Sequence, residues 1–73
     1  MKLPVVSGLQ AIKAFKKAGW NPIRQAGSHV IMMKEGSDVT LSIPLHKNVK
    51  RGTLRALIRD SGLTVSEYVK LLK

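Results

Sequence analysis

Two stretches with helical periodicity flank a middle stretch that has the pattern of β-strands, and this order allows few folds for a chain of 73 residues. Ser7 and Gln10 fit a capping box at the start of the first stretch. Apolar residues follow at helical spacing, and Gly19 supplies a left-handed helix end. This pattern predicts a helix over about residues 8 to 18. Its expected apolar face comprises Leu9, Ala11, Ile12, Phe15 and Ala18.

The middle stretch has the pattern of three strands. Residues 23–34 have the β-branched content and the length of two short strands with a break near Gly27. Residues 35–38 are typical of a turn, and residues 39–43 alternate with period two until Pro44, which cannot donate to a strand ladder. Three residues of this last strand would face the core: Val39, Leu41 and Ile43. The stretch predicts a three-stranded antiparallel meander.

The end of the chain is again helical. Apolar spacing predicts a helix over about residues 51 to 61, closed by Gly62. Thr64 and Glu67 then fit a second capping box ahead of a short final helix. The predicted order is α-β-β-β-α with an extra C-terminal helix. Helices that cover one face of a small antiparallel sheet make an α+β fold, and we expect residues 1–73 to form one domain.

The charge of the chain indicates an anionic partner. Thirteen Lys and Arg residues against four Asp and Glu give a net charge of +9, and such a field attracts nucleic acid. A membrane surface is the competing partner, but no segment has the large apolar face of an interfacial helix. The chain has no cysteine, which is typical of a reducing compartment. We therefore expect a cytoplasmic protein that contacts nucleic acid and not membrane.

Few residues could carry catalysis. The two histidines, His29 and His46, are far apart in sequence, and no metal-ligand spacing or cofactor motif is present, so we expect neither metal nor cofactor. A histidine acting alone could exchange protons with RNA, which carries its own nucleophile, the 2′-hydroxyl. His29 could be the base or the acid, and Arg24 could stabilise phosphate charge. The amides of Gly27 and Ser28 could donate to phosphate oxygens.

Each of these residues also has a plainer interpretation. His29 could be a packed or surface residue at a strand start, and for His46 we slightly favour a loop histidine without a catalytic role. Gly27 could serve only the turn. We expect Trp20 and Tyr68 to pack in the core rather than to stack on bases.

A basic cluster precedes and enters the predicted second helix. It comprises Lys47, Lys50, Arg51, Arg55 and Arg59, and no acidic residue lies between Asp38 and Asp60. Solvated helix faces usually mix both signs of charge, and a helix start already favours phosphate. We therefore expect Lys47, Lys50, Arg51 and Arg55 to contact RNA.

Four segments of the sequence resemble HicA-type mRNA interferase toxins in their order and spacing. They are "SGLQAIKAFKKAGW", "RQAGSHVIM", "IPLH" and "KRGTLRALIRDSGLTVSEY", and together they cover about Ser7 to Tyr68. The resemblance implies a double-stranded-RNA-binding-like fold and a small ribonuclease that cleaves mRNA without a metal. It also implies that His29, in the Gly-Ser-His motif, is catalytic. The implied partner is a HicB-type antitoxin that covers the active site.

The predicted sheet indicates a partner surface independently of that resemblance. Both faces of the second strand are apolar in sequence, and helices can cover only one of them. An apolar patch of this kind marks an interaction site, although its methionines could instead fold under the last helix. Two other functions stay open. One is a non-catalytic module that binds duplex RNA by shape, and the other is a domain that binds an acidic protein partner.

Overall fold

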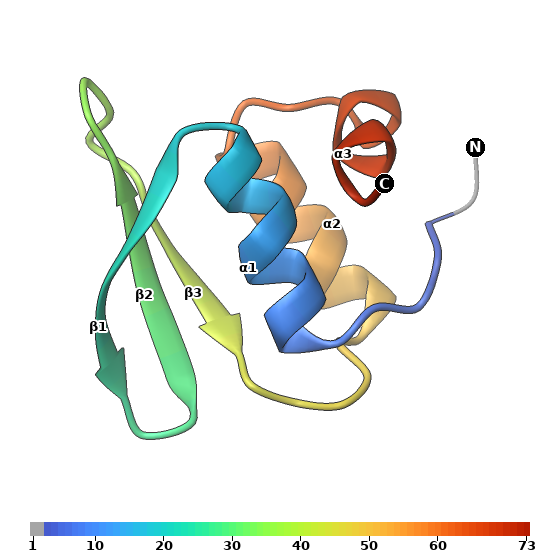
Figure 1. Ribbon diagram of the computed structural model, residues 1–73, viewed down its shortest axis with the longest axis horizontal. Helices are drawn as coiled ribbons and strands as arrows, with labels where there is room; N and C mark the ends of the chain where they lie inside the picture. Colours follow the sequence, from blue (N-terminus) through green and yellow to red (C-terminus); the bar gives the residue numbers. More distant parts are fainter. Residues whose placement is uncertain (1–2) are drawn as a thin grey trace.

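The computed structural model describes residues 3–73 and confirms the predicted order of elements (Figure 1). The strands form one sheet in the order β1-β2-β3, and both neighbouring pairs are antiparallel. Figure 1 shows α1 and α2 on one face of this sheet, with α3 packed against them. This is the α+β, double-stranded-RNA-binding-like fold expected from the sequence, and α3 is the extra helix. The elements are α1 (Gly8–Lys17), β1 (Trp20–Ala26), β2 (His29–Lys34), β3 (Thr40–Pro44), α2 (Arg51–Asp60) and α3 (Val65–Leu71).

Both predicted capping boxes are present. The Gln10 amide donates to the Ser7 hydroxyl at 3.1 Å, and the Ser7 amide donates to the Gln10 side chain at 2.8 Å. The same pair of bonds joins Thr64 and Glu67 at the start of α3. At the far end of α1, Gly19 has a φ of 97°, the left-handed conformation that ends a helix. Local side-chain chemistry therefore fixes these helix boundaries.

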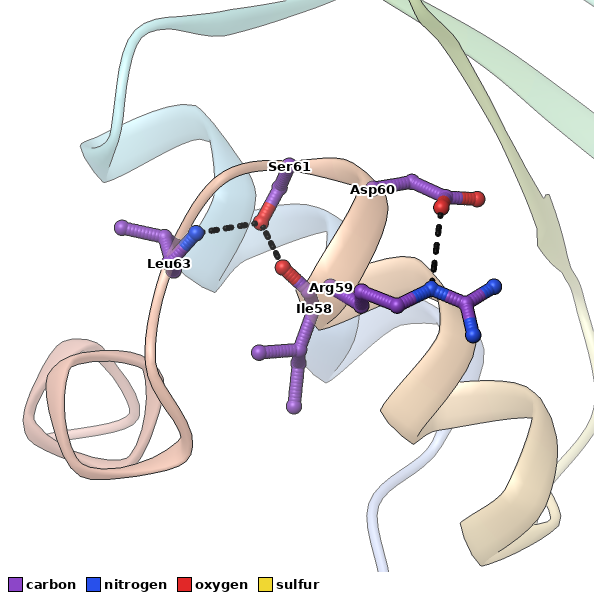
Figure 2. Close-up of polar contacts among 5 residues, drawn as sticks. All are labelled: Ile58, Arg59, Asp60, Ser61 and Leu63. Atoms are coloured by element: carbon purple, nitrogen blue, oxygen red, sulfur yellow. Dashed lines mark hydrogen bonds and ion pairs between the residues drawn. The ribbon is translucent and has the colours of Figure 1, made fainter.

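Ser61 stabilises the connection from α2 to α3 through hydrogen bonds of its side chain (Figure 2). Its hydroxyl donates to the Ile58 carbonyl at 2.6 Å and accepts from the Leu63 amide at 3.4 Å. Beside it, Arg59 Nε lies 3.4 Å from Asp60 Oδ1, with both side chains exposed. Exposed pairs of this kind add little stability, so Ser61 has the larger part in shaping the turn.

The core lies between the inner face of the sheet and the three helices. The Phe15 and Tyr68 rings contact each other with their centres 5.1 Å apart, and Trp20 is also buried. The prediction that Trp20 and Tyr68 serve packing is confirmed. The largest fully buried side chains are Trp20, Tyr68, Phe15, Leu3, Met32, Leu41, Ile43, Leu54 and Ile58.

Two residues expected in the core are exposed. Leu9 is 69% exposed because it lies on the side of α1 that carries Lys13 and Lys16, four and seven residues further on. Val39 is 39% exposed and precedes β3. Its amide donates to the Ser37 hydroxyl at 3.2 Å, a local turn bond in place of a strand ladder bond. The prediction from apolar spacing that these two residues lie in the core is therefore wrong.

The outer face of the sheet keeps some apolar surface. His29, Ile31 and Met33 alternate on this face of β2, and Met33 is 40% exposed while Ile31 is half-buried. Met32, on the opposite face, is fully buried. Among residues 3–73, no helix combines the length and the apolar character needed to cross a bilayer.

Tyr68 carries a hydroxyl that has no hydrogen-bond partner within residues 3–73. Burial raises the pKa of Tyr68 to about 12 from an ordinary value of 10.0. A buried hydroxyl without a partner costs roughly 1–3 kcal/mol, so we expect Tyr68→Phe to leave the free energy of unfolding unchanged or to raise it by about 1 kcal/mol. Denaturant unfolding at neutral pH measures this difference.

The same substitution changes the response to alkali. Because the pKa of Tyr68 is higher in the folded state, the unfolded chain loses its proton first as the pH rises. The contribution of the neutral phenol is complete below pH 10 and is lost as the pH approaches about 12. The stability advantage of Tyr68→Phe should therefore grow above pH 10, and a constant difference from pH 7 to pH 11 would contradict this account.

Candidate functional site

The turn between β1 and β2 places His29 at the first position of the central strand. The turn consists of Gly27 and Ser28. Gly27 has a φ of 61°, a conformation that residues other than glycine rarely adopt. Glycine at the first central position is typical of a two-residue hairpin turn. The Gln25 side-chain amide donates to the Gly27 carbonyl at 2.9 Å. The break predicted near Gly27 is thus a tight hairpin that starts β2 at His29.

A second set of backbone contacts brings the segment after β3 to the same place. His29 is the register partner of Pro44, and the Leu45 amide donates to the Ser28 carbonyl at 2.7 Å. The next carbonyl, that of His46, accepts from the Gly8 amide at 2.9 Å. In Figure 1 the β1–β2 turn, the end of β3 and the start of α1 lie together at the lower end of the molecule.

Both histidines line one open pocket of about 440 Å³. The pocket is formed by the start of β2, the end of β3, the loop that follows it and the first turn of α2. Its lining residues are His29, Ser42, Pro44, His46, Lys50 and Thr53. Both imidazoles, Lys50 and Thr53 are exposed, and Pro44 is buried beneath them. An exposed pocket of this kind can receive one segment of a long polymer.

The charge at this pocket is positive. Lys50 is the N-cap of α2 and makes no side-chain capping bond, and the first turn of α2 contains no acidic residue. The positive end of the helix dipole is therefore not offset by a local carboxylate. The six residues that line the pocket also include no carboxylate. This arrangement favours an anionic group such as phosphate.

The other predicted site residues lie around the pocket rather than in it. Arg24 is the register partner of Ile31 and so lies on the outer face of the sheet, as His29 does. Gly27 and Ser28 form the turn beside the pocket without lining it. Of the basic cluster, Lys50 lines the pocket, whereas Lys47, Arg51 and Arg55 are exposed on the loop and along α2. Within residues 3–73 the one ion pair is Arg59–Asp60.

Sequence reasoning missed part of the pocket. Ser42, Pro44 and Thr53 were not considered as site residues, and His46 was interpreted as a loop histidine. The signal for Pro44, His46 and Thr53 lies in the segments "IPLH" and "GTL", which contribute to the resemblance, whereas Ser42 lies outside both segments. Among residues 3–73, no group of three His, Asp or Glu side chains is arranged to hold a metal ion.

Comparison with known proteins identifies the family of the chain. Residues 9–63 match the family described as the HicA toxin of bacterial toxin–antitoxin systems. A search of curated proteins found no match. The matched segment begins in α1 and ends after α2, so it contains the whole sheet and every residue that lines the pocket. The chain belongs to the HicA toxin family, whose members are toxins paired with an antitoxin.

Proposed function

We propose that this toxin is an endoribonuclease that cleaves mRNA at the pocket containing His29, without a metal ion. The observation that carries the proposal is the exposed imidazole of His29 in an open pocket that also contains Lys50 and Thr53. A histidine can move a proton near neutral pH. RNA supplies its own nucleophile, so the protein needs only proton transfer and groups that hold the phosphate.

The surrounding residues support a polyanionic substrate. Lys50 supplies a positive charge inside the pocket, and the Thr53 hydroxyl can donate to a phosphate oxygen. We assign Lys47, Arg51 and Arg55 to the sugar–phosphate chain on either side of the cleaved bond, where their exposed charges would attract it. Arg24 would contact the chain across the outer face of the sheet. Gly27 and Ser28 would act by shaping the turn that presents His29.

The proposed cellular context follows from the family. A toxin that acts on mRNA works in the cytoplasm, and its antitoxin would be of the HicB type. Ile31, which is half-buried, and Met33, which is exposed, extend the outer face of the sheet beside His29, and partly exposed apolar side chains of this kind are suited to a protein contact. An antitoxin that covers this face would also block the pocket.

The fold supports one alternative, a module that binds duplex RNA by shape without cleaving it. Incubation of the purified protein with RNA in excess EDTA separates the two. We expect cleavage to continue in EDTA and to leave a 2′,3′-cyclic phosphate on one fragment and a 5′-hydroxyl on the other, because the 2′-oxygen is the nucleophile.

Two other results of this assay would have clear meanings. Tight binding of RNA without cleavage would select the binding module. Cleavage that EDTA abolishes, or products with a 5′-phosphate, would contradict the proposed chemistry, since an attack by the 2′-oxygen leaves no phosphate on the 5′ side of the downstream fragment.

A further inference from the structure

We propose that His46 is a second catalytic residue of this site and performs the proton transfer that complements that of His29. This inference rests on the proposed ribonuclease function. The chain has only two histidines, and they are 17 residues apart in sequence, yet both line the same pocket. The tertiary fold therefore brings two distant parts of the chain to one pocket.

The position of His46 relative to His29 is fixed by the backbone. The pairing of His29 with Pro44 aligns the two strands, and the bond from the Leu45 amide to the Ser28 carbonyl, 2.7 Å long, continues this alignment beyond the end of β3. The bond from the Gly8 amide to the His46 carbonyl then fastens the loop to α1. These two backbone bonds fix the position of His46, whereas a residue in a flexible linker would have no fixed position.

The fold does not require the imidazole of His46. Its structural contact is made by the carbonyl oxygen, which any residue would supply, while the side chain is exposed and has no hydrogen bond within residues 3–73. His46 lines the pocket that contains His29, and it also borders a neighbouring pocket formed with Ser7 and Leu9. The backbone of His46 thus serves the fold, and its imidazole is available for a chemical role.

Cleavage of RNA needs two proton transfers, one at each side of the phosphorus atom. The 2′-oxygen bonds to phosphorus as its proton passes to one neutral imidazole, and the bond from phosphorus to the 5′-oxygen breaks as the other, protonated imidazole gives its proton to the departing oxygen. One ring gains a proton and the other loses one, and exchange with water restores both. No oxidation or reduction is involved.

The other polar residues of the pocket are less suited to these transfers. The lysine ammonium is a compact positive charge with three donors, so Lys50 is suited to hold the phosphate oxygens. The hydroxyls of Ser42 and Thr53 can donate hydrogen bonds but are weak bases. An imidazole can accept a proton in its neutral form and donate one in its protonated form, so the two histidines are the pocket residues suited to both transfers.

The test compares wild type, His29→Ala and His46→Ala on two RNAs. One is ordinary RNA, and the other carries sulfur in place of the 5′-bridging oxygen at a bond that wild type cleaves. A thiolate departs without being protonated, so this substrate needs no general acid. Asn48→Ala is the matched control, because Asn48 is exposed in the same loop and does not line the pocket. Thermal unfolding monitored by circular dichroism checks the fold of each variant.

We expect each histidine variant to cleave ordinary RNA about 10²–10⁴-fold more slowly than wild type, the usual size of a general acid–base contribution. On the sulfur-containing RNA, one of the two variants should recover to within about tenfold of wild type, and the other should stay slow. The variant that recovers identifies the general acid. Asn48→Ala should behave as wild type on both substrates.

The outcomes distinguish this inference from the proposed function. If His46→Ala cleaves ordinary RNA as fast as wild type while His29→Ala is slow, the role of His46 is overturned and the ribonuclease function stands. Recovery of both variants, or of neither, would overturn the division of labour between the two imidazoles. If wild type cleaves neither RNA, the proposed function fails, and the inference fails with it.

Discussion

His29→Ala is expected to slow RNA cleavage by about 10²–10⁴-fold and to leave the fold intact. The imidazole is exposed at the first position of β2, so its removal creates no cavity in the core. The backbone of His29 keeps its place between Ala26 and Pro44. The loss should therefore appear in the rate of cleavage and, in cells, as loss of growth arrest. Surface substitutions of this kind change stability by about 0.5 kcal/mol or less.

The matched control for His29→Ala is Thr40→Ala. Thr40 is exposed on β3, and its register partner is Met33, so it lies on the same outer face without lining the pocket. We expect this variant to keep its activity. Binding of the cognate antitoxin should survive in both variants, because both keep Ile31 and Met33, the apolar residues to which we assign that contact. Full toxicity in a folded His29→Ala variant would contradict a catalytic role for His29.

The ends of α1 could be predicted because local chemistry decides them, whereas β1 begins at Trp20 rather than at residue 23 and β3 includes Pro44. The capping box of Ser7 and Gln10 and the left-handed Gly19 fix the two ends of α1 within the local sequence. Leu9 and Val39 were misassigned for the opposite reason. Their exposure depends on which side of α1 meets the sheet and on where the β2–β3 ladder begins, and apolar spacing contains neither piece of information.

The same distinction between local and tertiary information applies to the residues of the candidate site. His29 could be selected from a short motif, since its turn, its strand and its chemistry all lie within a few residues. His46 could not, because its distance from His29 depends on the β2–β3 register and on a bond from α1 to the loop. The sequence shows two histidines far apart, and only the fold brings them to one pocket. Thr53 could not be predicted either, because it reaches the pocket only through the position of α2 in the fold.

Gly8→Ala is expected to destabilise the fold strongly, although it removes no atom from the core. A Cβ at position 8 would lie 2.2 Å from the Pro44 carbonyl oxygen and 3.0 Å from Leu45 Cα, and both of these are backbone atoms. A flexible side chain could move aside, but a strand end bonded to Ser28 cannot do so without breaking that bond. Overpacking of this kind costs about 1–3 kcal/mol, occasionally more.

That cost is large for so small a domain. Stability of roughly 0.05–0.15 kcal/mol per residue gives this chain about 4–11 kcal/mol in total. A loss of about 3 kcal/mol should lower the melting temperature by roughly 12–24 °C. Thermal unfolding measures the shift. Gly52→Ala is the matched control, because Gly52 also lies in the first turn of a ten-residue helix and a Cβ there would meet nothing within 4 Å; it should stabilise slightly.

Gly8→Ala also tests how the site is held together. The added methyl group would push the start of α1 away from the loop and weaken the bond from the Gly8 amide to the His46 carbonyl. At a temperature where the variant is still folded, its cleavage rate should fall while its affinity for RNA, which depends on exposed cations along α2, changes little. A variant that melts with wild type would show that α1 can move away from the loop at no cost. In that case the position of His46 would depend on the β2–β3 register alone.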